Sequence, residues 1–278
     1  MTKLGVGTLG FAAIVAMSAT GGPAAAQEVN PNPTFIPVPA DTTVNNQGGA
    51  FTSFDISFAD SVTGNIFIAD RSNAGVDIFS GSSLTFLGRA TGFTGQKATT
   101  STSGPDGVLT VTTGGVTTLY AGDGNSSLRV YNATNPAAPT LAPGAPIFTG
   151  GNFRVDEMAY SPMSHQVLAA NNADTPAFGT LFSTNNGAPP VTLTTSPITI
   201  PGQIGQGGME QPAWNPTTGT FFVSIPTING TDPGGVAEIS TAGQVLRTID
   251  LATVSAGAIS SCSPAGLAIS ASGNMLVA

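Results

Sequence analysis

The sequence predicts an all-β fold, a β-propeller of four-stranded antiparallel blades. Three observations predict it. The chain has many turn residues, with 36 glycines and 21 prolines, and only 8% of its residues are charged. A hairpin pattern also returns at a spacing of roughly fifty residues, which is typical of propeller blades. Frequent turns and few charges favour short strands over long helices, and the positive mean hydropathy excludes a disordered polar chain.

The clearest copy of the hairpin is Met209–Ile225. It predicts a strand over Pro212–Trp214, a turn over Asn215–Gly219 and a second strand over Thr220–Ser224. Asn-Pro and Thr-Gly are turn pairs, whereas Phe-Phe-Val suits a pleated and buried surface.

The same order of strands and turns recurs along the chain. The first blade is expected to contain the strands Phe54–Phe58, Asn65–Asp70, Gly75–Phe79 and Thr85–Arg89. The second, third, fourth and fifth blades begin at Asp106, Asp156, Met209 and Pro264, and the fourth ends with strands over Val236–Ile239 and Val245–Ile249. Short strands separated by turn signals at regular intervals are the pattern of an all-β repeat fold.

The small residue near the end of each second strand supports this register. These residues are Ala69, Gly122, Ala170, Ser224 and Ala278, which gives steps of 53, 48, 54 and 54. Propeller blades are about 40 to 50 residues long, whereas the common helical repeats are shorter. Because Ala278 falls inside the second strand of the fifth blade, we expect the propeller domain, residues 50–278, to be truncated at its C-terminal side. The expected parent has six blades, with seven as the alternative.

The first residues predict export. Lys3 precedes an apolar run over Leu4–Met17, and Ala24–Ala26 supplies a cleavage site of small residues. This pattern predicts a signal peptide over residues 1–26 and a periplasmic or secreted protein, with a membrane anchor as the alternative. Residues 27–49, rich in Pro and Asn, are expected to form a flexible leader or an edge segment, with an edge strand over Phe35–Pro39.

Charge and cysteine content limit the partners. The formal net charge is −8, and it becomes −9 when Lys3 is removed, so the chain has little to attract a nucleic acid. After cleavage we expect no stable membrane insertion and a monomer. Cys262 is the only cysteine, so it is either a buried thiol or a partner in an intermolecular disulfide.

Acidic residues recur where first strands begin and second strands end. The two positions lie at the same end of an antiparallel sheet, so these side chains are expected to gather at one mouth of the channel. Seven of the 15 carboxylates are in this set, together with one amide: Asp55, Asp106, Asp156, Glu157 and Glu210 at strand starts, and Asp70, Asp123 and Asn171 at strand ends.

Three interpretations of this acidic mouth stay open. Carboxylate and amide oxygens are the ligands that Ca²⁺ or another hard divalent cation prefers. Arg71 and Arg154 lie directly beside the set, and they favour a structural role in which the acids tie neighbouring blades together. The third interpretation is solubility alone.

The repeats also resemble a known group of proteins. The strands IFIAD, LYAGD and VLAAN are similar to YVTN, NHL and regucalcin/gluconolactonase-like propeller repeats, and the stretches RVDEMAYSP and GMEQPAWNPTTGTFFVS resemble exported bacterial propellers. In the gluconolactonase-like family, a Glu followed by Pro and an aromatic residue helps to bind a divalent ion. The resemblance therefore implies Glu210 as a metal ligand, although the motif is one residue longer here, with Asn171 and Asp123 as further ligands.

Other candidate functional residues and loops give weaker indications of a reaction or a ligand. His165, the only histidine, is expected in an exposed turn at the opposite end of its blade. Trp214 and Tyr160 occupy equivalent positions and are expected to pack between blades or to line the channel. The loops Asn172–Asp174 and Ile228–Gly235 extend from the acidic face, where loops often contact ligands.

Two functional hypotheses follow. In the first, the protein is a non-catalytic binding or scaffold module that recognises a protein, peptide, glycan or small molecule through its acidic face. In the second, it is a metal-dependent hydrolase of the lactonase or esterase kind, in which an ion activates water. The absence of a histidine from the predicted mouth favours the first.

Overall fold

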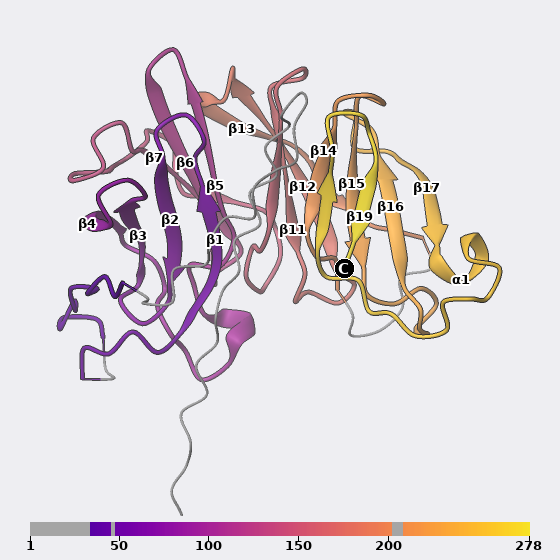
Figure 1. Ribbon diagram of the computed structural model, residues 1–278, viewed down its shortest axis with the longest axis horizontal. Coiled ribbons are helices and arrows are strands. Elements are labelled where there is room, and N and C mark those ends of the chain that lie inside the picture. The colour runs from indigo at the N-terminus through magenta and orange to yellow at the C-terminus, as the bar shows by residue number, and fades with distance from the viewer. Residues whose placement is uncertain (1–33, 46–47, 202–207) are drawn as a thin grey trace, which may run out of the picture. The chain divides into compact units, whose positions relative to one another are not determined.

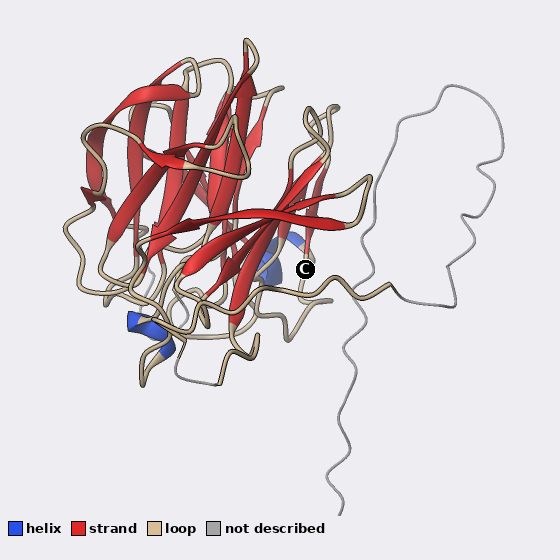
Figure 2. Cartoon of the chain, turned by 90° about the vertical axis from the view of Figure 1, so that its left-hand side faces the viewer, coloured by secondary structure: helices blue, strands red, loops and turns tan. Residues whose placement is uncertain are grey.

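A computed structural model describes residues 34–45, 48–201 and 208–278. The chain divides into two units, residues 1–35 and 36–278, and the second contains the fold. The predicted signal peptide and the segment 27–33 lie outside the described residues. Almost all regular structure is β-strand, as Figure 2 shows, which confirms the predicted class.

The strands form five successive antiparallel sheets, each from one continuous part of the chain. Figure 1 shows these sheets in chain order. The first contains β1 (Phe54–Ala59), β2 (Asn65–Asp70), β3 (Gly75–Ser80) and β4 (Thr85–Thr91). After the short helix η1 (Thr100–Thr102), the second contains β5 (Val108–Thr113), β6 (Val116–Asp123), β7 (Ser127–Asn132) and an outer strand in two pieces, β8 (Thr140–Leu141) and β9 (Ile147–Phe148).

The later sheets repeat this order. The third contains β10 (Met158–Ser161), β11 (Gln166–Asn171), β12 (Phe178–Asn185) and β13 (Ala188–Ile198). The fourth contains β14 (Pro212–Asn215), β15 (Thr220–Ile225), β16 (Gly235–Ile239) and β17 (Val245–Asp250), and the helix α1 (Leu251–Val254) follows it. In the fifth sheet, β18 (Leu267–Ile269) pairs with β19 (Met275–Val277).

The hydrophobic core is divided among the boundaries between consecutive sheets. Neighbouring residues of one strand enter different clusters, because successive side chains of a strand point to opposite faces. Leu119 packs with the first sheet and Tyr120 with the third. Phe221 packs with the third sheet and Phe222 with the fifth. The second, third and fourth sheets are therefore each buried on both faces, as a propeller blade between two neighbours must be.

The first strands of successive sheets contact one another, from β1 to β5, β10, β14 and β18. The first strand is therefore the innermost strand of each blade. Outer strands tolerate residues that an inner strand cannot, because proline has no N–H to donate to a ladder. β13 contains Pro189, Pro190 and Pro197 and forms the outer edge of its sheet.

One predicted strand is wrong. Residues 34–40 form no regular structure, although a strand was expected over Phe35–Pro39. The two prolines of this segment lack the N–H groups that a ladder needs. Isolated hydrogen bonds connect this part of the chain to the first blade instead of a ladder. The Pro39 carbonyl accepts from Arg89 Nη2 (2.8 Å), and the Asp41 N–H donates to Asn73 Oδ1 (2.9 Å).

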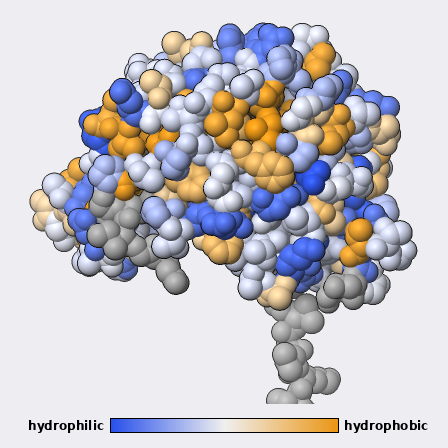
Figure 3. Space-filling model, turned by 180° about the vertical axis from the view of Figure 1, so that it is seen from behind, coloured by the Kyte–Doolittle hydropathy of each residue, from blue (hydrophilic) through white to orange (hydrophobic). Residues whose placement is uncertain are grey.

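The surface mixes apolar and polar side chains. Figure 3 shows the two kinds interspersed on the face seen from behind. Exposed apolar residues such as Phe148 and Leu276 belong to outer strand pieces or to the fifth sheet. Within the described residues, no helix has the length and apolar character needed to cross a membrane.

The boundary between the third and fourth blades offers a test of this architecture. Phe221 is fully buried there, and its ring lies edge-on to Trp214 with centroids 4.9 Å apart. We expect Phe221→Ala to lower the free energy of unfolding by about 3–5 kcal/mol, because it removes the ring and leaves a cavity. Urea unfolding measures the change. Phe148→Ala, which truncates an exposed ring, is the control and should change stability by less than about 0.5 kcal/mol. Equal effects of the two variants would contradict the shared core.

Candidate functional site at the start of the inner strands

The inner strands begin at equivalent positions. The N–H groups of Asp106, Asp156 and Glu210 donate to the carbonyls of Gly122 (3.1 Å), Ala170 (2.7 Å) and Ser224 (3.0 Å), respectively. The predicted repeat register is therefore correct in these three blades. In the fifth blade the equivalent residue is Ala265, whose N–H donates to the Ala278 carbonyl (2.9 Å). The series of acidic side chains thus ends at the fourth blade.

Glycines allow the second and third blades to come close together here. A Cβ atom on Gly107 would lie 1.8 Å from the Asp156 carbonyl oxygen, and one on Gly122 would lie 1.9 Å from the Val155 carbonyl oxygen. Such distances exclude any side chain. Backbone packing consequently holds Asp106, which precedes Gly107, near Asp156 of the next blade.

Five carboxylates, which we call the inner carboxylates, gather at this end of the sheets: Asp55, Asp106, Asp156, Glu157 and Glu210. Three of them are joined by arginines in an alternating series across the first three blades. Arg71 Nη2 binds both Asp55 and Asp106. Arg154 Nε lies 3.8 Å from Asp106 and 2.7 Å from Asp156. The two arginines that the sequence places beside the acids therefore bind them directly.

The alternating series stops before the fourth blade. Among the described residues, neither Glu157 nor Glu210 forms an ion pair with an arginine or lysine. Asn172 Nδ2 approaches both oxygens of Glu210 at 3.5 Å, and Glu157 Oε2 is buried without a hydrogen-bond partner. Among the described residues, no cationic side chain is paired with this part of the cluster.

Burial and mutual repulsion raise the pKa values of these carboxylates. Burial, followed by Asp156 and Glu210, raises the pKa of Glu157 to about 10. Burial, followed by Asp156, raises the pKa of Glu210 to about 7. Burial also raises the pKa of Asp106 and of Asp156, against the opposing effect of their arginines. Glu157 therefore holds a proton at neutral pH, whereas Glu210 changes its charge near pH 7.

The acidic residues at the second-strand ends form separate clusters. Asp123 accepts from Thr94 and the Gly124 N–H through Oδ1 and from Arg129 Nε (2.9 Å) through Oδ2. Asp70 binds Asn73 and lies 3.6 Å from Arg89. Since Thr94 belongs to the link between the first two blades, Asp123 ties these blades together.

Asn171 has the same kind of role at the next boundary. Its Nδ2 donates to Ser126 Oγ (3.2 Å) and Thr149 Oγ1 (2.8 Å), which belong to the preceding blade, and its Oδ1 accepts from Thr180 (3.0 Å). The nitrogen and the oxygen of this side-chain amide therefore both have hydrogen-bond partners within the fold.

The ligand set implied by the gluconolactonase resemblance does not fit one ion in this arrangement. The oxygens of Asp123 and Asn171 already accept hydrogen bonds in two different clusters, and Glu210 contacts Asn172 instead. Within residues 34–45, 48–201 and 208–278, no group of three or more His, Cys, Asp or Glu side chains is arranged to hold a metal ion.

The remaining candidates lie where the sequence suggested or take part in packing. His165 is in the turn at the opposite end of its blade, as expected, but it is half-buried and not exposed, and its Nδ1 lies 3.3 Å from the Tyr160 hydroxyl. Trp214 packs against the core between the third and fourth blades. Sequence reasoning did not find Asp77, which lies 2.5 Å from Arg89 Nε and whose pKa burial raises to about 7. Its alternation with apolar neighbours in β3 gave no sign of burial.

No protein-family model matches the sequence, and no curated protein matches it closely enough to count as a relative. Solved structures do resemble the fold. A hydrazine synthase from Kuenenia stuttgartiensis matches with a TM-score of 0.56 and 12% identity, over 80% of this chain and 60% of that chain. A protein of unknown function from Bacteroides thetaiotaomicron matches with a TM-score of 0.52 and 16% identity, over 83% and 53%.

The β-propeller domain of Cps50 (Swd1) from Myceliophteria thermophila matches with a TM-score of 0.50 and 11% identity, over 80% of this chain and 61% of that chain. This chain thus spans between about half and three fifths of each of these chains. At such low identities the likeness concerns the fold alone, and that fold is the β-propeller.

The raised pKa of Glu157 predicts a pH dependence of stability. The folded state retains a proton up to about pH 10, whereas the unfolded chain loses it above its ordinary pKa of 4.5. Stability is therefore lost as the pH rises between these values. We expect Glu157→Gln, which has no proton to lose, to unfold with a flatter pH profile and to be about 1–3 kcal/mol more stable than the wild type at pH 8. Urea unfolding from pH 5 to 9 measures this, with Asp232→Asn, which alters an exposed carboxylate, as the control. Parallel profiles for the wild type and Glu157→Gln would contradict the assignment.

Proposed function

We propose that this protein is an exported, non-catalytic β-propeller that binds a cationic partner, such as a lysine-bearing or arginine-bearing peptide segment, at the inner carboxylates. One observation carries the proposal. The series of alternating acids and arginines extends from Asp55 to Asp156 and then ends with a protonated Glu157 and with Glu210, which has no ion-pair partner among the described residues. A basic group from a partner would continue the series.

The geometry around Glu210 supports this role. The side chain is only partly buried, so a partner can reach it. Its hydrogen bonds from Asn172 are long, at 3.5 Å, and an ammonium or guanidinium group would form shorter, charge-assisted ones. Asp55 also retains some exposure beside Arg71. A cationic partner would therefore meet acceptors from more than one blade.

Export is proposed from the first 26 residues. Their basic tip, apolar run and Ala-rich end are the features of a cleaved signal. We expect the protein recovered from the periplasm or medium of an expressing bacterium to begin at Gln27, as N-terminal mass spectrometry would show. Recovery of the chain with Met1 intact in the membrane fraction would favour an anchor instead.

A peptide titration tests the binding proposal. We expect the protein to bind hexalysine at pH 8 and low salt and to bind uncharged hexaserine at least about ten-fold more weakly. Glu210→Gln should weaken hexalysine binding about ten-fold, because Glu210 is the inner carboxylate that is both accessible and without an ion-pair partner among the described residues. Lowering the pH from 8 to 6 should weaken binding to the wild type, since the pKa of Glu210 is about 7 and its protonated form is neutral.

Asp232→Asn provides the matched control for this titration. It removes one negative charge from an exposed loop residue and leaves the inner carboxylates intact. If Asp232→Asn weakened binding as much as Glu210→Gln, binding would depend on overall charge and the site would be wrong.

The alternative function is a metal-dependent hydrolase of the lactonase or esterase kind. One buried oxygen each of Asp106, Asp156 and Glu157 lacks a hydrogen-bond partner and is of the type that hard cations bind, but within the described residues these side chains are not arranged as a metal-binding group. Thermal melts with calcium and with chelator separate the two functions, because an ion that binds only the folded state raises its stability. A calcium-dependent rise that Glu210→Ala abolishes, together with lactone hydrolysis, would replace the binding proposal.

A further inference from the structure

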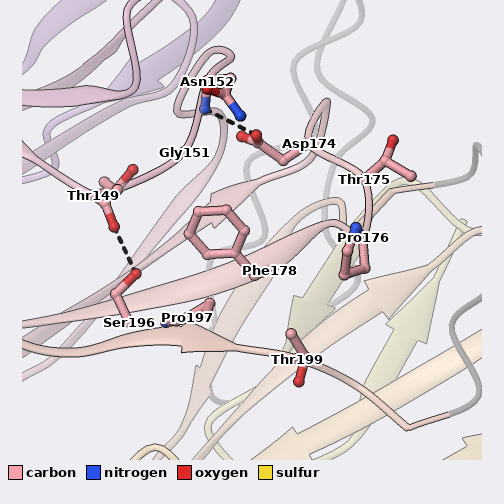
Figure 4. A pocket seen from close by; sticks show the side chains of 11 residues that line it. Thr149, Gly151, Asn152, Asp174, Thr175, Pro176, Phe178, Ser196, Pro197 and Thr199 are labelled. Atoms are coloured by element: carbon pink, nitrogen blue, oxygen red, sulfur yellow. Dashed lines mark hydrogen bonds between the residues drawn. The ribbon is translucent and has the colours of Figure 1, made fainter.

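A cavity of about 300 Å³ lies apart from the inner carboxylates, at the boundary of the second and third blades. Three segments line it: residues 149–152 after β9, residues 174–178 between β11 and the start of β12, and residues 196–199 at the end of β13. Figure 4 shows Phe178 in the middle of this lining, with Asp174 and Thr175 on one side and Ser196 and Pro197 on another. The volume is that of a site for a small molecule.

Asp174 is the only ionisable residue among the described residues of the lining. Its Oδ1 accepts from the Asn152 N–H at 2.9 Å, and its Oδ2 accepts from the Phe153 N–H at 3.4 Å. A Cβ atom on Gly151 would lie 2.5 Å from the same Oδ2, so a larger residue there would displace the carboxylate from its present position. The backbone thus fixes the position of Asp174.

The Asp174 carboxylate has no cation. It forms no ion pair with any described arginine, lysine or histidine, although its side chain is largely buried. Two carboxylate oxygens offer about four acceptor positions, and the two N–H groups use half of them. The remaining positions can accept hydrogen bonds from a ligand.

Carbon surface makes up part of the remaining lining, beside the polar side chains of Asn152, Thr175 and Thr199. Phe178, Pro176 and Pro197 supply carbon surface. Ser196 Oγ donates to the Thr149 carbonyl (2.8 Å), which fixes the wall opposite Asp174. The pocket therefore combines one carboxylate with an aromatic ring and aliphatic rings, a combination that recognises an ammonium group on a short hydrocarbon body.

We propose that this pocket binds a small organic cation, with its ammonium group against Asp174 and its hydrocarbon part against Phe178 and the two prolines. The buried negative charge favours a cation over a neutral ligand of the same shape, because an ammonium group supplies both charge and three hydrogen-bond donors. The inference concerns a site separate from the inner carboxylates and does not depend on the function proposed for them.

Calorimetric titration of the whole chain with n-pentylamine at pH 7.5 tests the proposal, with n-pentanol as the neutral probe of matched length. We expect pentylamine to bind about ten-fold or more tightly than pentanol. Asp174→Asn should weaken pentylamine binding about ten-fold and leave pentanol unaffected. Pentylamine binding that Glu210→Gln weakened and Asp174→Asn did not would place the amine at the inner carboxylates and would overturn the proposal for this pocket, so the two sites are tested separately.

A second variant guards against misfolding of Asp174→Asn. Phe178→Leu keeps an apolar side chain but offers less carbon surface to the alkyl chain, and it should weaken the binding of pentylamine and pentanol alike, by up to several-fold. Equal binding of pentylamine and pentanol, no binding of either, or no effect of both substitutions would overturn the proposal. Binding of glucose in preference to pentylamine would overturn it in favour of a saccharide site.

Discussion

The structure depends on the two-residue period of its strands. In β6, β11 and β15, adjacent apolar residues enter different cores, so each sheet serves two interfaces at once. No single blade can bury its own faces, and the blades therefore stabilise one another in sequence. The same requirement brings the inner strands together, with glycines where the second and third blades come closest. The acidic residues that begin these strands have to share a small volume as a result.

The acidic residues fall into two groups that differ in their electrostatic partners, according to whether they lie at a first-strand start or at a second-strand end. Those at second-strand ends find hydroxyl, amide and arginine partners beside neighbouring sheets, and they tie blades together. Those at first-strand starts have fewer partners available, and two arginines serve three of them. Glu157 and Glu210 are left with burial and repulsion, which raise their pKa values. Acidic residues at equivalent positions of different blades therefore differ in their ion pairs and in their pKa values.

The repeat could be predicted from the sequence because turn pairs and apolar strands are local signals. β2 has the predicted bounds, and the hairpin around Asn215–Gly219 forms as expected. The divided outer strand β8 and β9 and the proline-bearing β13 were not predicted, since outer strands lack a clear apolar pattern. The partners of Asp123 and Asn171 were also beyond prediction, because Thr94 and Thr149 come from links between blades. Likewise, the pocket beside Asp174 combines three segments far apart in the chain.

The division of each sheet between two cores has a consequence for protein engineering. A graft that exchanged the whole unit β10–β13 would replace half of two different interfaces at once and leave the other halves unmatched. A graft that exchanged one interface, with the facing sides of two adjacent sheets, would keep the complementary surfaces together. The unit that can be recombined is therefore a boundary between blades, and chimaeras should be designed by face rather than by repeat.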